Sequence, residues 1–320
     1  MNMGLKNKDL LSIADLDPEE VHAILDAGAA CKAKQKQGAL FVPLLGKTLG
    51  MIFHKPSART RLSFDIGMYQ LGGHAILLKD EDIGLNKREP VEDVARLFAR
   101  YMDGVVIRTF DHDLVTRFAQ HATIPVINGL TDFSHPCQIL ADLMTLREQK
   151  KTLKGLKVAF IGDGNNVANS WAFGAAKVGI HLSIASPKGY ELLPDVLREA
   201  QSYAKESGGS IVLTNSPVAA ATGADLLYTD VWTSMGQEDE RRERLEAFDG
   251  FQIGEPLMKK AKGDAIVMHC LPAHRGEEIS AEVMERFSKV IFDEAKNRLH
   301  VQKGLMVLLM GKPEVFKLKG

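Results

Sequence analysis

The chain has 320 residues, of which 45% are hydrophobic and 25% charged, a composition typical of a folded globular protein with about two domains. Forty basic residues against forty-one acidic ones leave a net charge of −1, which excludes the global positive field of a dedicated nucleic-acid binder. Three widely spaced cysteines without a CxxC pair argue against a disulfide framework and against a cysteine-rich zinc site.

Targeting and membrane segments are not expected. No uninterrupted apolar run reaches the ~18 residues that a membrane helix needs. The first twenty residues turn acidic, lack the apolar core of a signal peptide and lack the Arg-rich, acid-poor composition of a transit peptide. We therefore expect a cytoplasmic protein with no membrane partner and no nucleic-acid partner.

Short apolar runs alternate with segments of helical period along the whole chain. The runs predicted as strands are Leu49–His54, His74–Leu78, Gly104–Arg108, Pro125–Asn128, Lys157–Gly162, His181–Ala185, Ile211–Thr214, Asp225–Thr229, Ala265–His269 and Val290–Asp293. Strand–helix alternation predicts the α/β fold class, with parallel sheets covered by helices on both faces.

Among the helices, Leu62, Ile66 and Tyr69 show the spacing of one helix face, and Gly72-Gly73 is a typical C-terminal stop. A second helix is predicted at Val91–Tyr101.

A helix at Cys137–Glu148 would bridge two halves of the chain, and a polar stretch follows at residues 149–154. We therefore expect a first domain at residues 1–150 and a second at residues 151–299. The apolar segment Leu305–Met310 suggests that a C-terminal helix, residues 300–320, packs back on the first domain.

Polar side chains follow the predicted strands, where ligands of open α/β sheets bind. The segment from Lys55 to Arg61 opens a helix directly after a strand, with Ser57 as a candidate N-cap. Such a helix N-terminus attracts phosphate, although an Arg-rich surface helix is the alternative. Arg108 ends the next strand and belongs either to a site or to a surface ion pair. His135, held extended by the following proline, either faces a substrate or bonds to loop backbone.

The run Gly162-Asp163-Gly164-Asn165-Asn166-Val167 follows a strand but lacks the third small residue of a dinucleotide fingerprint. The next strand ends at Ser186 with no acid for a ribose, so a nicotinamide dehydrogenase is disfavoured. The asparagines either offer amides to a small polar ligand or form a turn.

Asp230 follows another apolar strand and could hold an ammonium group, and Ser234-Met235-Gly236 is typical of a mobile loop. Cys270 could be a nucleophile, a weakly polar contact or a buried apolar residue. A metal set of Asp230, His269 and Cys270 is disfavoured because no HExxH or CxxC accompanies it. The charged run 237–244 is either a solvated helix face or part of a lid.

Together these motifs closely resemble the ornithine carbamoyltransferase family, within the aspartate/ornithine carbamoyltransferase superfamily. The residues that carry the resemblance are Phe53 to Arg61, His135-Pro136-Cys137-Gln138, Gly162 to Asn166, Asp230 with Ser234-Met235-Gly236, and His269 to Gly276. The first two motifs are shared with the aspartate branch, whereas the Ser-Met-Gly loop and the His-Cys-Leu-Pro segment point to the ornithine branch.

The resemblance implies two α/β domains with the active site in the cleft between them, a catalytic trimer, carbamoyl phosphate and L-ornithine as substrates, and no metal or other cofactor. It assigns carbamoyl phosphate binding to Ser57, Ala58, Arg59, Thr60, Arg108, His135, Pro136, Cys137, Gln138, Cys270, Leu271 and Arg298. It assigns ornithine binding to Asn166, Asp230, Ser234 and Met235. The residues it implies in catalysis are Arg108, His135, Gln138, Asp230, Cys270 and Arg298.

Two positions depart from the family pattern. Ala58 stands where many relatives have threonine, which matters little if that position acts through its main chain. Gly84 stands where many relatives have a glutamine that reaches a neighbouring subunit's carbamoyl phosphate, and Lys87 or Arg88 could substitute. A carbamoyltransferase for another amine and a catalytically silent binding subunit are the alternative hypotheses.

Overall fold

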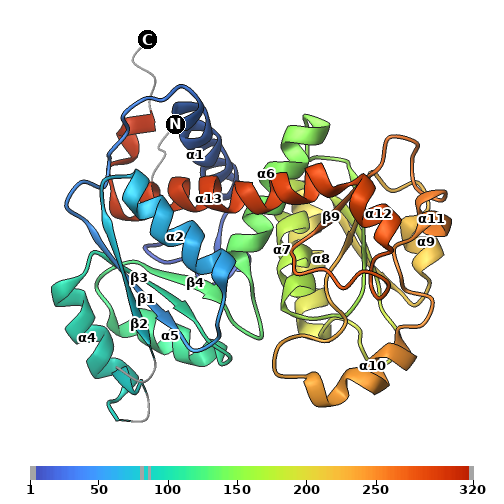
Figure 1. Ribbon diagram of the computed structural model, residues 1–320, viewed down its shortest axis with the longest axis horizontal. Helices are drawn as coiled ribbons and strands as arrows, with labels where there is room; N and C mark the ends of the chain where they lie inside the picture. Colours follow the sequence, from blue (N-terminus) through green and yellow to red (C-terminus); the bar gives the residue numbers. More distant parts are fainter. Residues whose placement is uncertain (1–4, 80–82, 86–87, 317–320) are drawn as a thin grey trace. The chain divides into compact units, whose positions relative to one another are not determined.

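The computed structural model describes residues 5–79, 83–85 and 88–316 (Figure 1). The chain divides into two compact units, which are described separately below. Unit 1 is Met1–Met144 with Asn297–Gly320, and unit 2 is Thr145–Lys296. No helix in the described ranges is long and apolar enough to cross a membrane.

Unit 1 is built on a parallel sheet of strand order β2-β1-β3-β4. Its strands are β1 (Thr48–Phe53), β2 (His74–Lys79), β3 (Gly104–Arg108) and β4 (Val126–Leu130). Its helices are η1 (Ile13–Asp15), α1 (Pro18–Lys36), α2 (Ala58–Gln70), α4 (Val91–Tyr101), α5 (His112–His121) and η3 (Pro313–Phe316), with most of α6 (Pro136–Lys150) and of α13 (Ser288–Met310). Parallel pairing aligns the strand ends, so that Phe53 lies opposite Arg108.

Helices cover both faces of this sheet (Figure 1). Helices α4 and α5 bury Phe98 and Phe118 against Ile52 and Ile107. Helices α1, α2 and α13 lie on the other face. Gly28 of α1 allows a close helix crossing there, because a Cβ at that position would lie 2.9 Å from the Val301 Cα of α13.

Unit 2 is built on a second parallel sheet, of order β7-β6-β5-β8-β9. Its strands are β5 (Lys157–Ile161), β6 (His181–Ala185), β7 (Ser210–Thr214), β8 (Leu226–Thr229) and β9 (Ile266–His269). Its helices are α7 (Asn166–Val178), α8 (Pro194–Ser207), α9 (Pro217–Ala221), η2 (Glu238–Glu240), α10 (Arg241–Ala247), α11 (Glu255–Met258) and α12 (Ala281–Arg286). Helix α7 is buried along nearly its whole length, as expected of a helix that is covered by other helices.

The predicted fold class is confirmed, and the nine predicted strands up to Ala265–His269 match β1 to β9. The tenth prediction, Val290–Asp293, is wrong because these residues form the first turns of α13. Ile291 and Glu294 are fully buried whereas Phe292 is 57% exposed, which is the period of a helix. Periodicity alone does not separate a short apolar run of a strand from one of a helix.

The predicted helix at Leu62–Tyr69 is confirmed as α2, and the face that carries Leu62, Ile66 and Tyr69 is not the buried one. Leu62, Ile66 and Tyr69 are 54%, 41% and 81% exposed. The buried face instead carries Phe64 and Met68 with smaller residues between them. Unit 1 therefore presents a row of large apolar side chains on the outer face of α2.

Candidate active site

The loop between β1 and α2 forms a helix N-terminus with free donor groups. Ser57 caps α2 by accepting a hydrogen bond from the Thr60 N–H at 3.3 Å. Ala58 and Arg59 are exposed in the first turn, and Arg59 forms no ion pair with any residue that the structure describes. The unpaired N–H groups and the positive end of the helix dipole make this turn suitable for an anion.

Arg108 is a buried cation at the end of β3. Its side chain is 5% exposed, and within the described ranges its Nε has no hydrogen-bond partner and no carboxylate pairs with it. Burial, together with the positive charges of Arg298 and Arg59, lowers the pKa of Arg108 to about 9. A buried cation without a counter-ion is costly. The surface ion pair considered for this residue is therefore excluded, and a bound anion would compensate its charge.

His135 lies at the start of α6, where burial lowers its pKa well below the ordinary value for histidine. The positive charges of Arg298, Arg108 and Arg59 lower it further. The imidazole is therefore neutral at physiological pH and offers one N–H donor rather than a charge.

We expect His135→Gln to make the free energy of unfolding fall less steeply as the pH is lowered. In the native chain the unfolded state takes up a proton below about pH 6.5 while the buried imidazole does not, so stability falls as the pH falls. One such group contributes a slope of about 1.4 kcal/mol per pH unit. Urea unfolding between pH 7.5 and 5 measures this slope. Exposed His22 provides the control, since His22→Gln should keep the native slope. If the free energy of unfolding fell with pH at the same slope in His135→Gln and in the native chain, the prediction would be contradicted.

Arg298, from α13, joins two helices of unit 1. Its guanidinium donates to the Gln138 Oε1 at 2.6 Å and to the Thr60 Oγ1 at 3.1 Å. With the Gln302 amide oriented to satisfy its neighbours, its oxygen accepts from the Arg298 Nε at 3.1 Å. The Gln138 Nε2 in turn donates to Asp142 Oδ1 at 2.8 Å.

Asp142 and Gln302, which the sequence pattern did not single out, hold the predicted residues in place. Each lies four positions after a predicted site residue on the same helix, Gln138 and Arg298 respectively, and is fully buried. A polar residue one turn beyond a site residue was the available signal, because positions i and i+4 share one helix face.

Pro136 and Cys137 form the first turn of α6. The Cys137 thiol is fully buried and donates to the Asn128 carbonyl at 3.6 Å, and burial raises its pKa to about 12. This side chain is inert and structural, so Cys137 can serve a ligand only through its main chain.

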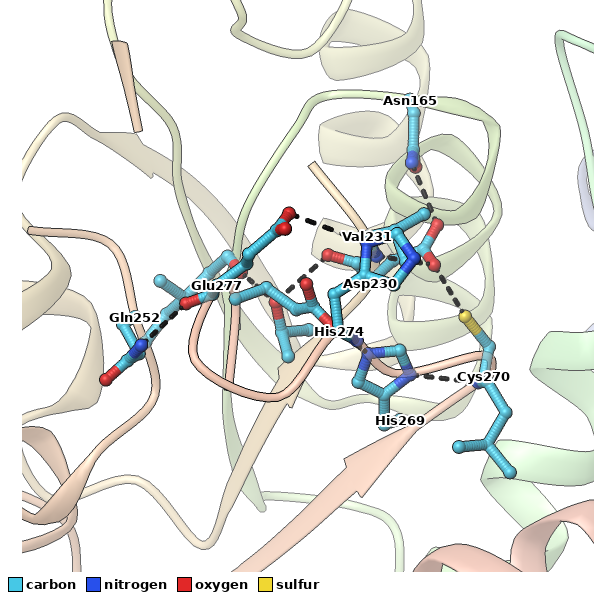
Figure 2. Close-up of polar contacts among 12 residues, drawn as sticks. Asn165, Asp230, Val231, Gln252, His269, Cys270, His274 and Glu277 are labelled. Carbon is cyan, nitrogen blue, oxygen red and sulfur yellow. Dashed lines mark hydrogen bonds and ion pairs between the residues drawn. The ribbon is translucent and has the colours of Figure 1, made fainter. Parts of the chain in front are cut away.

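In unit 2, the Asp230 carboxylate after β8 collects three donors (Figure 2). It accepts from Asn165 Nδ2 at 3.0 Å, from the Val231 N–H at 2.8 Å and from the Cys270 Sγ at 2.9 Å. Cys270 is thus a half-buried thiol hydrogen-bonded to a carboxylate, and its interpretation as a buried apolar residue is wrong. Asn165 also caps α7, so that one amide both forms the turn and orients Asp230.

His269 lies fully buried behind Cys270 (Figure 2). Its Nδ1 accepts from the Leu271 N–H at 2.9 Å, and its Nε2 bonds to Glu278 Oε1 at 3.0 Å. Ligand atoms of Asp230, His269 and Cys270 lie within 4.8 Å of one another. Both ring nitrogens of His269 are engaged, however, which further disfavours a metal set and gives the histidine the role of holding the Leu271 backbone.

The Ser-Met-Gly loop is open to solvent. Met235 is 47% exposed, and the Ser234 N–H donates to Gln237 Oε1 at 3.0 Å. Asn166 is the first residue of α7, next to the Asn165 that holds Asp230.

The glycines after β5 allow close backbone packing rather than dinucleotide binding. A Cβ on Gly164 would lie 2.4 Å from the Glu191 carbonyl carbon. The loop before α8 therefore occupies the space that the second glycine provides, which explains that glycine without a pyrophosphate.

Gly84 has a φ of +60°, a backbone conformation that favours glycine, and its carbonyl accepts from the Arg88 N–H at 2.7 Å. The side chain of Arg88 lies 4.0 Å from Glu89. Lys87, the other substitute suggested for the missing glutamine, lies outside the described residues.

The structure thus gathers two sets of predicted residues, one in each unit. Unit 1 holds a cluster of arginines at a sheet edge, and unit 2 holds a carboxylate with a thiol donor at a sheet edge. This combination is that of a two-domain α/β protein with cationic side chains gathered in one unit and a buried carboxylate in the other.

The chain belongs to the aspartate/ornithine carbamoyltransferase family. The family model for the carbamoyl-P binding domain matches residues 8–148, and the model for the Asp/Orn binding domain matches residues 154–309. The ornithine carbamoyltransferase of Anoxybacillus flavithermus is 52% identical over 306 residues, covering 96% of this chain and 98% of that protein.

Solved structures agree. The chain resembles the ornithine carbamoyltransferase from Pyrococcus furiosus with a TM-score of 0.91 and 49% identity, over 94% of this chain and 96% of that one. It resembles the anabolic ornithine carbamoyltransferase from Campylobacter jejuni with a TM-score of 0.89 and 40% identity, over 95% and 99% of the two chains.

Proposed function

We propose that this enzyme transfers the carbamoyl group of carbamoyl phosphate to the side-chain amine of L-ornithine, giving L-citrulline and phosphate, as a step of arginine metabolism. The observation that carries the proposal is Arg108, a buried cation that no carboxylate of the described ranges neutralises, beside the charges of Arg59 and Arg298. Such a site binds a small dianion more readily than a neutral ligand.

Carbamoyl phosphate occupies unit 1 in this proposal. The first turn of α2, with Ser57, Ala58, Arg59 and Thr60, takes the phosphate on N–H groups, hydroxyls and a guanidinium. Residues 135–138 at the start of α6 and Arg298 of α13 surround the carbamoyl end. Cys270 and Leu271 of unit 2 offer main-chain groups to the carbamoyl nitrogen.

The chemistry is nucleophilic attack by a neutral amine on the carbamoyl carbon. The carbonyl oxygen gains negative charge as the tetrahedral intermediate forms, and donors from Thr60, Arg108 and neutral His135 stabilise it. The C–O bond to phosphate then breaks as the attacking nitrogen loses a proton to the departing phosphate oxygen. The product leaves as HPO₄²⁻, which Arg59 and the α2 N-terminus stabilise.

Ornithine occupies unit 2. Asn166, Ser234 and Met235 bind its body, and Asp230 orients the side-chain amine and favours loss of its proton. Transfer is direct, without a covalent enzyme adduct, and Cys270 positions the amine together with Asp230.

We expect Cys270→Ser to retain turnover, reduced about tenfold to a hundredfold, because a serine hydroxyl also donates to the Asp230 carboxylate. Steady-state citrulline formation measures the effect, and mass spectrometry of the native enzyme with carbamoyl phosphate alone should find no carbamoylated protein. Loss of all turnover together with a trapped carbamoyl adduct on Cys270 would overturn direct transfer.

We also propose a homotrimer, or a multiple of trimers, working in the cytoplasm. The exposed apolar row of α2, Leu62, Ile66 and Tyr69, is a surface that self-association would cover. The three cysteines are free thiols, as a reducing compartment keeps them.

The test of the function is citrulline and phosphate formation with carbamoyl phosphate and a panel of amines. We expect L-ornithine to be used far better than putrescine or an acylated ornithine. Preference for another amine would overturn the substrate assignment, and the absence of phosphate release with every amine would identify a silent binding subunit.

A further inference from the structure

Arg244 is a buried arginine within the charged run 237–244, which the sequence pattern favoured as a solvated helix face. Its neighbours Arg241 and Arg242 on α10 are exposed, whereas Arg244 is 6% exposed. The residue therefore has a role inside unit 2 that charge density alone does not indicate.

The guanidinium of Arg244 connects three parts of the chain. One nitrogen donates to Asp163 Oδ2 at 2.9 Å and to the Trp232 carbonyl at 3.0 Å, and Nε donates to Glu240 at 2.9 Å. Asp163 follows β5, Trp232 precedes the Ser-Met-Gly loop, and Glu240 follows that loop. One side chain thus fixes both ends of the loop to the sheet edge.

Apolar packing shields this junction from water. Trp232 is 5% exposed and stacks on Phe248 with ring centroids 5.4 Å apart. The Arg244 guanidinium lies 5.0 Å from the centre of the Tyr190 ring, which itself packs on Phe248. Hydrogen bonds of a charged group are stronger in such surroundings, so these contacts stabilise the loop base, whereas Met235 at the loop tip is exposed.

The junction is also coupled to Asp230. The pKa of Asp163 is raised to about 6, chiefly by burial; the carboxylates of Asp230 and Glu240 contribute to the rise, and the Arg244 charge opposes it. Asn165, two residues beyond Asp163, donates to Asp230. Removing Arg244 would therefore disturb both the loop base and the carboxylate expected to hold the amine.

We propose that Arg244, held by Asp163, is a positioning residue that sets the Ser-Met-Gly loop for ornithine without touching either substrate. This inference rests on the proposed function, because it takes Ser234, Met235 and Asp230 as the ornithine site. It predicts an effect on ornithine binding that is separate from carbamoyl phosphate binding.

The experiment compares Arg244→Met, Arg244→Lys and Asp163→Asn with the native enzyme. For Arg244→Met we expect the KM for ornithine to rise about tenfold or more, as for the loss of one charge-assisted contact. The KM for carbamoyl phosphate should stay within twofold, and Arg244→Lys should recover part of the loss. Glu246→Gln, an exposed change on the same helix, is the control and should behave as the native enzyme.

A second readout does not depend on activity. Trypsin cleavage after exposed Arg241 or Arg242, mapped by mass spectrometry, should become faster in Arg244→Met because the loop base is no longer fixed. Unchanged ornithine KM together with unchanged cleavage would overturn the proposal. Asp163→Asn gives the same test if Arg244→Met fails to fold. A native enzyme that makes no citrulline would defeat the proposed function, while the cleavage rate would still test the loop anchor.

Discussion

Arg108→Met is expected to lower kcat/KM for carbamoyl phosphate about 10³-fold while leaving the free energy of unfolding unchanged or higher. The activity falls because the variant loses a donor placed for the developing oxyanion. Stability does not fall because the native side chain is a buried cation, unpaired within the described ranges, whose charge folding must desolvate.

The expected effect of Arg108→Met on the free energy of unfolding follows from the pKa of Arg108. Arg108 has a pKa of about 9 in the folded chain, below its ordinary value, so the folded state binds this proton less tightly than the unfolded state. The penalty for burying the charge is therefore present at neutral pH, where stability is measured. Methionine keeps much of the volume and removes the charge.

Urea unfolding at pH 7 and steady-state kinetics measure the two effects. Phosphate should raise the Tm of the native enzyme but not that of the variant, because a ligand stabilises only a state that binds it. Exposed Arg100 on α4 is the control, and Arg100→Met should change neither quantity. A variant with native activity, or one clearly destabilised, would refute the anion-site interpretation of Arg108.

Asp230→Asn is expected to lower kcat roughly 10²–10³-fold with ornithine. The three donors on the carboxylate hold it in place, and asparagine preserves its shape but not its charge. Without that charge the incoming amine is neither oriented nor helped to lose its proton.

Binding of carbamoyl phosphate should survive this change, since the residues proposed to contact its phosphate lie in unit 1. The rise in Tm on adding carbamoyl phosphate therefore separates the two sites. Exposed Asp249→Asn serves as the control. Native kcat in Asp230→Asn, or loss of the carbamoyl phosphate effect on Tm, would contradict the assignment of Asp230 to the amine.

Local sequence patterns were sufficient to predict the nine strands β1 to β9 and several residues at the ends of those strands. Ser57 is the N-cap that its residue type predicted, and Arg108, Asp230 and His269 lie at the ends of their strands as their positions after apolar runs indicated. These features depend on spacing of two or 3.6 residues and on capping chemistry within one turn, which the sequence displays directly.

Long-range packing decided the rest. The sequence pattern grouped Leu62 with Ile66 and Tyr69 on one helix face and placed Val290 in a strand. Neighbouring helices bury another face of α2, and Val290 is part of α13. The contacts of Arg298 with Gln138 and of Arg244 with Asp163 join residues far apart in the chain. Which face of a helix is covered, and which buried charge finds a partner, depends on elements distant in sequence, so only the tertiary structure could determine them.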